Sequence, residues 1–385
     1  MGGGVAGGGW SQPADALVRY LALPVVLAGI YHLIALTAAL RRAGKREGRL
    51  SNFQPGVSIL KPVYGRDPNF CEAIRSHAVL DYPEYEILFG LNDPQDAARA
   101  DIARLADEFP ERHIRVIECP PNMPNAKVAS LAELSRHAKY PLLLVNDSDI
   151  TVERDYLRIV VRPLEDPKTG LVTCLYRAKG ESWPARWEAL GIATDFAPSV
   201  LVARAIGIAE FALGSTMAFR AADLERIGGF AAIGDYLADD YQLGLRMNEL
   251  GKRIALAPTT VETRLSDDTW TAVWRHQVRW SRTIRVSRTA GYFGYVITNA
   301  SFWAILAAAA GAWPVGITAL SIRMLAGVIT GRSALGDQET LRLWFLIPFR
   351  DLWGFAVWIA GLGGSTVEWR GTRLRLRRDG RIALG

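Results

Sequence analysis

The sequence predicts an α/β domain built on a mostly parallel sheet, with membrane-spanning helices before and after it. Two contrasts along the chain carry this prediction: long apolar segments lie near both ends, and short apolar strands alternate with helical segments between them. Of the 385 residues, half are hydrophobic and 22% are charged, which excludes a disordered or fibrous chain. The three cysteines form no CxxC pair, which excludes a zinc ribbon and favours reduced thiols facing the cytosol.

The first apolar segment, residues 17–40, is long enough for one helix to cross a bilayer. It is too long for the core of a typical signal peptide, and no A-x-A-like cleavage site follows it. Residues 1–16 are expected to be a disordered tail, and residues 41–54 form a basic linker. Because positive charge stays on the cytoplasmic side, the linker predicts an inner (plasma) membrane protein whose next domain is cytoplasmic.

The second apolar region, residues 295–331, is too long for one crossing and has a proline near its middle, so a transmembrane hairpin is expected. A third segment, residues 343–367, contains Arg350 and Asp351. Because charges are costly in lipid, we favour a re-entrant or interfacial segment there over a full crossing. Residues 368–385 are strongly basic and are expected to form a cytoplasmic tail.

Residues 55–269 between these regions are expected to form the catalytic α/β domain. Its apolar runs predict strands at 57–63, 85–93, 114–118 and 141–149, with helices at 70–80 and 127–137. Ligands of such sheets bind beyond the carboxyl ends of the strands. Asp93, Asp147 and Asp149 all fall at such ends.

Asp147 and Asp149 are two residues apart and closely follow the apolar run LLLV. Hard oxygen ligands of this kind select Mg²⁺ or Mn²⁺, and a nucleotide diphosphate needs such a cation to neutralise its leaving group. An isolated D-x-D is more often a turn or a helix cap. Its position after a buried strand favours a functional site.

A second acidic pair, Asp239 and Asp240, precedes the helical stretch QLGLRMNELG. One carboxylate could cap that helix, and the other could serve as a general base for an acceptor hydroxyl.

Residues 270–290 have apolar and basic side chains at helical spacing, which predicts an amphipathic helix at a membrane surface. A lipid-anchoring role does not explain the group Gln277, Arg279 and Trp280. The basic residues cluster beside the apolar segments, so we expect lipid headgroups and the bilayer as partners, and no nucleic acid.

Taken in order, these motifs resemble those of the inverting GT-A glycosyltransferases. The chain is similar, more closely, to glycosyltransferase family 21, which holds the ceramide glucosyltransferases and bacterial hopanoid-associated glycosyltransferases. The similarity also covers the segments VSILKPVYG (57–65), PNAKVASL (124–131), LVTCLYRA (171–178), FALGSTMAFRAADLERIGGF (211–230) and EWRGTRLR (368–375). It implies a GT-A fold, a nucleotide-diphospho-sugar donor and a membrane lipid acceptor.

The resemblance also implies a role for each acidic position. Asp93 matches the residue that contacts the uridine part of a UDP-sugar. Asp147 matches the residue at the diphosphate and its metal, and Asp149 completes the metal-binding D-x-D. Asp240 matches the catalytic base, and Asp239 occupies the preceding acidic position.

Four further positions would complete the donor site. Lys127 aligns with a lysine that precedes the D-x-D strand, and both donor binding and a solvated surface position are open for it. Gln277, Arg279 and Trp280 match a Q-x-x-R-W motif near the diphosphate and the acceptor. The Arg279 guanidinium could stabilise charge on the leaving group.

One departure leaves the substrates open. Residues 194–207 contain no histidine, whereas animal ceramide glucosyltransferases carry one there. The sequence of residues 194–207 is instead typical of the hopanoid-associated branch. The expected sugar is therefore glucose or N-acetylglucosamine, and the expected acceptor is a ceramide or hopanoid type of lipid. Two alternatives are a processive polysaccharide synthase, which needs more spanning helices for a channel, and a non-catalytic membrane protein, which the complete set of carboxylates disfavours.

Overall fold

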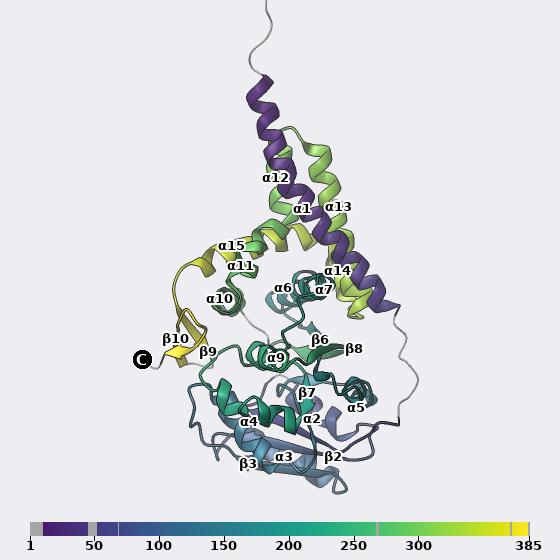
Figure 1. The fold of residues 1–385 in the computed structure, drawn as a ribbon, viewed down its shortest axis with the longest axis vertical. Helices are drawn as coiled ribbons and strands as arrows, with labels where there is room; N and C mark the ends of the chain where they lie inside the picture. Colours follow the sequence, from purple (N-terminus) through teal and green to yellow (C-terminus); the bar gives the residue numbers. More distant parts are fainter. Residues whose placement is uncertain (1–10, 45–51, 68, 267–268, 370–371, 384–385) are drawn as a thin grey trace, which may run out of the picture.

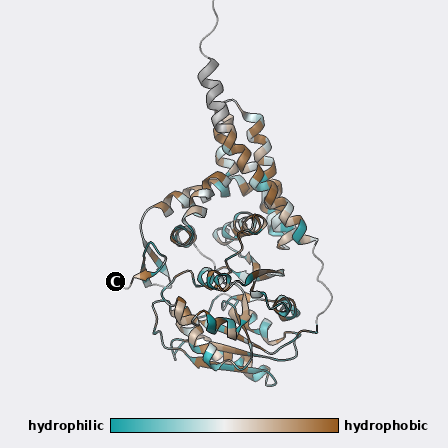
Figure 2. Ribbon diagram, viewed as in Figure 1, coloured by the Kyte–Doolittle hydropathy of each residue, from teal (hydrophilic) through white to brown (hydrophobic). Residues whose placement is uncertain are grey.

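The computed structural model describes residues 11–44, 52–67, 69–266, 269–369 and 372–383. An α/β domain forms the broad part of the molecule, and a narrow helical bundle projects from it (Figure 1). The bundle consists of α1 (Ser11–Ala43), α12 (Ala300–Ala309) and α13 (Trp313–Ile329). Figure 2 shows that hydrophobic residues dominate this bundle, whereas the surface helices of the domain are mixed.

The domain is built on an eight-stranded mixed sheet. In sheet order its strands are β3 (His113–Glu118), β2 (Tyr85–Leu91), β1 (Val57–Val63), β4 (Leu142–Val145), β7 (Met217–Arg220), β6 (Thr169–Lys179), β8 (Arg253–Arg264) and β5 (Ile150–Thr151). The first four are mutually parallel, and β7 is antiparallel to β4 and β6. The expected strands and the expected α/β class are therefore confirmed.

Helices cover both faces of this sheet, which is why the central strands are almost entirely apolar. One face packs on α2 (Phe70–Ala78), α3 (Ala98–Glu108) and α5 (Tyr156–Val161). The other face packs on α4 (Ala126–His137), α8 (Ala221–Arg226) and α9 (Asp239–Glu249). Every residue of β1, β2 and β4 is buried.

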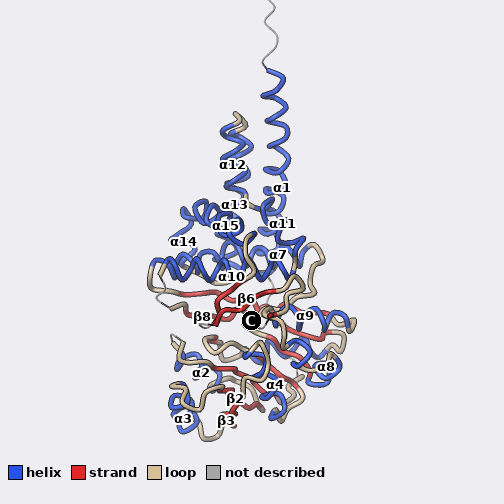
Figure 3. The backbone as a smooth tube through the Cα atoms, turned by 90° about the vertical axis from the view of Figure 1, so that its left-hand side faces the viewer, coloured by secondary structure: helices blue, strands red, loops and turns tan. Residues whose placement is uncertain are grey.

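A layer of helices lies between the sheet and the bundle (Figure 3). It contains α6 (Trp183–Gly191), the π-helical turn η2 (Ile192–Phe196), α7 (Ala197–Ala205) and α10 (Trp270–Ser287). Near it lie α11 (Thr289–Thr298), α14 (Glu339–Leu343) and α15 (Ile347–Leu362). This layer joins the α/β domain to the apolar helices.

Within the described residues, three helices are long and apolar enough to cross a membrane: 22–43, 313–334 and 339–362. The pair α11 and α12 would make a fourth if taken as one span, although it is bent by 46°. In Figure 1, α15 runs across the foot of the bundle rather than along it. Small side chains such as Val25, Ala307 and Ala319 fill the contact between the bundle helices.

The two ends of the chain differ from expectation. Helix α1 begins at Ser11, so residues 11–16 are helical rather than part of a disordered tail, and residues 1–10 lie outside the described part. The basic tail forms a three-stranded antiparallel sheet of β9 (Thr366–Trp369), β10 (Thr372–Leu376) and β11 (Ile382–Ala383). Its apolar side packs on Leu237.

Arg42, at the end of α1, fastens this helix to the α/β domain. Its guanidinium donates to the carbonyl oxygens of Ala257 at 2.8 Å, Pro258 at 3.0 Å and Thr259 at 2.8 Å. It also donates to the carbonyl of Ala334, at the end of η4 (Thr330–Ala334). One side chain therefore joins β8 and the segment after α13 to the first helix.

We predict that Arg42→Ala destabilises the protein by about 2 kcal/mol, because several partly buried carbonyls lose a charged donor at once. Thermal unfolding in detergent would measure the effect. Arg41→Ala is the matched control, since Arg41 is the exposed neighbour on the same helix end. Equal melting temperatures for the two variants would contradict the role given to Arg42.

Candidate active site

The D-x-D motif forms a tight turn after β4. The Thr263 hydroxyl of β8 donates to Asp149 Oδ2, and the Lys127 ammonium lies 2.7 Å from Asp147 Oδ1. Burial and then the neighbouring Asp147 charge raise the pKa of Asp149 to about 6. The turn therefore concentrates negative charge in a place where it is poorly solvated.

Lys127 is the cation that holds this acidic group together. Its ammonium also lies 3.5 Å from Asp239 Oδ2, and its side chain is only 14% exposed, so the solvated alternative considered for it is wrong. Burial disfavours the charge on Lys127, but the carboxylates of Asp147 and Asp239 outweigh it and raise its pKa. Asn125 caps the helix that carries Lys127 by accepting from the backbone N–H of Val128.

Asp240 lies in the first turn of α9 and faces the same point as Asp147 and Lys127. A Cβ added at Gly214 would lie 3.5 Å from Asp240 Oδ2, 3.6 Å from Asp147 Oδ2 and 3.6 Å from Lys127 Nζ. The three side chains therefore converge on the backbone of Gly214, where a glycine leaves room between them.

Backbone donors hold the Asp240 carboxylate in place. Oδ2 accepts from the N–H of Gly214 at 3.0 Å, and Oδ1 accepts from the N–H of Tyr241 at 2.7 Å. Burial and then the charge of Asp239 raise the pKa of Asp240 to about 6. We expected one of the two carboxylates, Asp239 or Asp240, to cap α9. Neither occupies the N-cap position, because the helix begins at Asp239 and its N-cap is Ala238.

A buried polar network beneath the D-x-D turn was missed by the sequence analysis. The ammonium of Lys61, from the middle of β1, donates to the Asp147 carbonyl at 3.1 Å and lies 3.5 Å from His77 Nε2. Asn146 donates to the Ser215 carbonyl at 2.7 Å, next to Gly214. This network ties the turn that carries Asp147 to the loop that holds Asp240. A lysine inside an otherwise apolar strand was the available signal.

Asp93 follows β2, at the same edge of the sheet as the D-x-D turn. The parallel register aligns Leu91 with Val63 of β1, and β1 pairs in register with β4. Asp93 is exposed, and its Oδ1 accepts the N–H of Gln95 at 2.8 Å. It lies at the edge but outside the group of contacts around Lys127.

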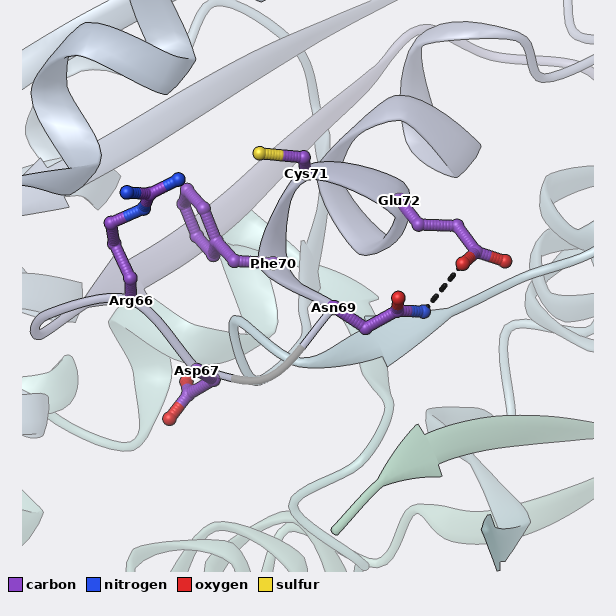
Figure 4. Close-up of a pocket in the computed structure, with 6 residues that line it drawn as sticks. All are labelled: Arg66, Asp67, Asn69, Phe70, Cys71 and Glu72. Atoms are coloured by element: carbon purple, nitrogen blue, oxygen red, sulfur yellow. Dashed lines mark hydrogen bonds between the residues drawn. The ribbon is translucent and has the colours of Figure 1, made fainter. Parts of the chain in front are cut away.

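The loop after β1 connects these two strand ends. Gly65 donates its N–H to Asp96 Oδ2 at 2.7 Å, and Ser148 donates its hydroxyl to Asp67 Oδ2 at 2.6 Å. The same loop borders an open cavity of about 430 Å³ at the start of α2. Figure 4 shows its lining residues, which are Arg66, Asp67, Asn69, Phe70, Cys71 and Glu72.

Residues 277–280 read QVRW, so one residue rather than two separates Gln277 from Arg279, and the Q-x-x-R-W spacing expected for them is wrong. Helix α10 places these residues on different neighbours. Gln277 is turned toward α15, where its Oε1 accepts from Arg350 at 3.1 Å and from Trp353 at 2.7 Å. The Trp280 ring packs against His276, with ring centroids 4.4 Å apart. Burial lowers the pKa of Arg279 to about 10, against the charge of Glu188 on α6. Gln277 thus contacts α15 rather than the acidic group around Lys127.

Tyr176 on β6 links these helices to the acidic group. Its burial raises its pKa above the usual value, and the charges of Glu188, Asp149 and Asp240 act in the same direction. Its ring also packs with partly buried Trp280 around Ala189. Side chains of α6 and α10 therefore lie one aromatic layer away from the carboxylates.

Two further basic residues of α10, Arg282 and Arg285, bind backbone carbonyls at and after the end of α15. Arg282 donates to the carbonyls of Gly363 at 3.0 Å and Thr366 at 2.6 Å. Arg285 donates to the carbonyls of Leu362 and Gly364. Cations at the carboxyl end of a helix satisfy its free carbonyls, so these two arginines cap α15.

A divalent cation fits the D-x-D turn by its donor set. No group of three or more His, Cys, Asp or Glu side chains in the described part of the chain is arranged to hold a metal ion. Asp147 and Asp149 would therefore supply two hard oxygen ligands, with the rest coming from water or a phosphate group. Burial and then the charge of Asp147 raise the pKa of Asp149, and a bound cation would offset both effects.

A solved structure defines the class to which this fold belongs. The mannosyltransferase PcManGT from Pyrobaculum calidifontis, in complex with GDP-Man and Mn²⁺, superposes with a TM-score of 0.56 at 19% identity. The match covers 90% of this chain and 99% of that one. The mixed sheet and its flanking helices are thus a GT-A-like glycosyltransferase fold, as expected.

The family follows from the sequence comparison. Residues 20–382 match the family described as glycosyl transferase family 21, and the chain belongs to it. Ceramide glucosyltransferase 3 of Caenorhabditis elegans is 29% identical over 232 residues, 59% of this chain and 50% of that protein. Ceramide glucosyltransferase 1 of the same organism is 29% identical over 206 residues, 53% of this chain and 44% of that one.

A bacterial relative matches over a longer stretch. The probable glycosyltransferase YdaM of Bacillus subtilis (strain 168) is 24% identical over 283 residues, 66% of this chain and 62% of that protein. The chain spans about half the length of the two Caenorhabditis elegans relatives.

We predict that Lys127→Met destabilises the protein by about 2 kcal/mol near neutral pH, because buried carboxylates lose their cation while Asp147 stays partly solvated. Without Lys127 the pKa of Asp239, already raised by burial, rises further. The deficit against the wild type should therefore shrink as the pH falls and these carboxylates become protonated.

Thermal unfolding in detergent between about pH 5 and about pH 8, the range in which most proteins are most stable, would test this. Lys168→Met is the control, since Lys168 is exposed. A deficit that grows toward acid pH would contradict the assignment.

Proposed function

We propose that this protein transfers one sugar from a UDP-sugar to a hydroxyl of a membrane lipid, with inversion at the anomeric carbon. The observation that carries the proposal is the convergence of Asp147, Lys127 and Asp240 on Gly214. Metal-binding and base-type carboxylates are thereby brought to one point, beside a layer of helices that leads to apolar spans. Membership of glycosyl transferase family 21 supports the same reaction class.

On the donor side, Asp147 and Asp149 would hold Mg²⁺ or Mn²⁺ together with the diphosphate. When bound, such a cation supplies charge stabilisation for the leaving nucleotide. Asp93 would contact the uridine part, since it is exposed at the same sheet edge. Lys127 and Arg279 are proposed as further donor-side cations, and Trp280 as an aromatic neighbour of the site. Gln277 was also expected to bind the donor, but its amide oxygen is turned toward α15, which does not support a donor-side role.

Asp240 is the proposed base. Its carboxylate would take the proton of the acceptor hydroxyl while that oxygen attacks the anomeric carbon from the face opposite the diphosphate. The new carbon–oxygen bond forms as the bond to the diphosphate breaks, and UDP leaves with the bonding electrons. Asp239 supports this role by raising the pKa of Asp240 and by holding Lys127.

We further propose that the α/β domain faces the cytoplasm at the inner (plasma) membrane. The basic residues after the first span and in the tail support this orientation. Ceramide is the acceptor suggested by the names of the Caenorhabditis elegans relatives. A hopanoid acceptor and N-acetylglucosamine as the sugar are the alternatives suggested by residues 194–207.

Lipid mass spectrometry of cells that express the chain should reveal a lipid heavier by one sugar residue, and the increment identifies the sugar. Cells that express Asp240→Asn should lack this lipid, because the loss of a general base costs about 100-fold or more in rate. Asp379→Asn, on an exposed turn of the tail, is the control. A polymer ladder in place of a single increment would favour a polysaccharide synthase, and full turnover by Asp240→Asn would exclude Asp240 as the base.

The pH dependence of transfer should report the ionisation of Asp240. The base must be deprotonated, and its pKa is raised to about 6, so kcat/KM should fall as the pH drops below about 6. Asp239→Asn removes the adjacent negative charge and should move this acid limb to lower pH. The measurement is a pH profile at saturating Mn²⁺. An acid limb that stays in place in Asp239→Asn would contradict the coupling between the two carboxylates.

A further inference from the structure

A second group of buried polar side chains lies where the layer of α6, η2 and α10 meets the apolar helices α13 and α15. We call it the junction cluster: Trp187, Glu188, Asp195, Gln277, Arg323, Arg350 and Asp351. These residues come from α6, η2, α10, α13 and α15. Of the thirteen buried side-chain polar atoms without a hydrogen-bond partner in the described residues, six belong to it, so it is where unmet hydrogen-bonding capacity concentrates.

Contacts within the cluster are continuous. The Arg350 guanidinium donates to Gln277 Oε1 at 3.1 Å, lies over the Trp187 ring at 5.8 Å, and approaches Asp195 Oδ2 at 3.6 Å. Arg323, on α13, binds Asp195 Oδ1 at 2.5 Å and Asp351 Oδ1 at 2.6 Å. The polar atoms therefore form one site rather than several separate defects.

The charges of the cluster balance. Arg323 and Arg350 carry two positive charges, and Asp195 and Asp351 carry two negative charges, at distances of 2.5 to 3.6 Å. The remaining acid, Glu188, lies 2.6 Å from His276 Nδ1. A phosphate or carboxylate headgroup would thus find no net positive charge to attract it.

The unmet capacity is almost entirely that of donors. The unpartnered atoms are the indole N–H of Trp187, the amide nitrogen of Gln277 and guanidinium nitrogens of Arg323 and Arg350. The one acceptor among them, Glu188 Oε1, faces His276. Gln277 is 6% exposed and Arg350 is 7% exposed, so bulk water does not compensate these donors. A buried donor without a partner is costly, and a ligand oxygen would relieve that cost.

The cluster adjoins the acidic group. Phe196 follows Asp195 directly, and its ring lies 5.2 Å from that of Tyr176. Tyr176 of β6 pairs with Val261 of β8, two residues before Thr263, whose hydroxyl donates to Asp149. Around the cluster, the rings of Trp187, Trp270, Trp274 and Trp353 are 5.2 to 6.1 Å apart. Tryptophans of this kind are typical of the boundary between lipid and water.

We propose that the junction cluster binds the uncharged polar head of the acceptor lipid, through hydroxyl or carbonyl oxygens that accept from Trp187, Gln277 and Arg350. This proposal rests on the proposed lipid glycosyl transfer and adds the chemistry of the acceptor and the residues that recognise it. The head would be held at the end of Tyr176 away from the carboxylates, so that one hydroxyl reaches toward Asp240. Gln277 thereby acts on the acceptor side, through the amide group that α15 orients.

Trp187→Phe is the sharpest test, because it removes the unpartnered N–H and keeps an aromatic ring. Transfer to short-chain ceramide in nanodiscs should show an acceptor KM raised about three- to tenfold, the effect of one lost hydrogen bond. The acceptor-independent hydrolysis of UDP-glucose should stay within about twofold of the wild type, the scatter expected where no contact is removed. Trp274→Phe is the matched control, since its indole nitrogen is not among the unpartnered atoms.

An unchanged acceptor KM in Trp187→Phe would overturn the proposal, because bound water rather than a lipid head would then satisfy the donors of the cluster. A parallel loss of UDP-glucose hydrolysis would also overturn it, because the cluster would then serve the donor or the fold. Arg350→Lys provides a second variant: it keeps the charge beside Asp195 but removes the guanidinium donors, and the same shift in acceptor KM is expected.

Native mass spectrometry separates this proposal from the proposed function. The detergent-solubilised wild type should retain short-chain ceramide in preference to phosphatidylglycerol, and Trp187→Phe should lose that preference. Retention of phosphatidylglycerol instead would contradict an uncharged headgroup. Retention of ceramide without any sugar transfer would leave the cluster standing and would refute the transferase activity.

Discussion

The active-site region depends on one electrostatic constraint: a buried lysine must balance a group of carboxylates that would otherwise repel each other. Lys127 contacts Asp147 and Asp239 directly and faces Asp240 across Gly214. Burial and then a neighbouring carboxylate, Asp147 or Asp239, raise the pKa values of Asp149 and Asp240. The remaining negative charge is what a divalent cation and a base-catalysed transfer would use. A buried network under the site, from Lys61 through His77 to Asn146, holds the turn that carries Asp147.

The region between the α/β domain and the apolar helices solves a different problem with the same means. Arg323 of α13 and Arg350 of α15 would be costly in lipid, and both pair with Asp195 of η2. Arg42 joins the first helix to β8, and Arg282 and Arg285 cap α15. Arginine suits these positions because its planar fork can satisfy several carbonyls or carboxylates at once. The apolar helices are therefore attached to the α/β domain by directed polar contacts as well as by apolar packing.

Much of the fold could be predicted because its signals are local. The run VSILKPV forms β1, and the apolar run before Asn146 forms β4, as periodicity and burial require. The grouping of Asp147 with Asp149 was predictable for the same reason, since both follow one strand. The orientation of Gln277 was not: helical spacing places it on a face of α10, but only the position of α15 decides that this face meets Arg350 and Trp353. The strands of the basic tail were missed because they are short and are stabilised by packing on Leu237.

The α/β alternation, the apolar segments at both ends and the acidic residues that follow the strands can all be predicted from the chain's residue pattern. These properties depend on the order of side chains over a few residues. The burial of Lys127 between carboxylates, and the contact of Asp195 with Arg323, 128 residues further along the chain, follow instead from how the folded elements pack. Such pairings depend on the packing of whole elements against one another, because a charge acts over distances in space that separation along the chain does not encode.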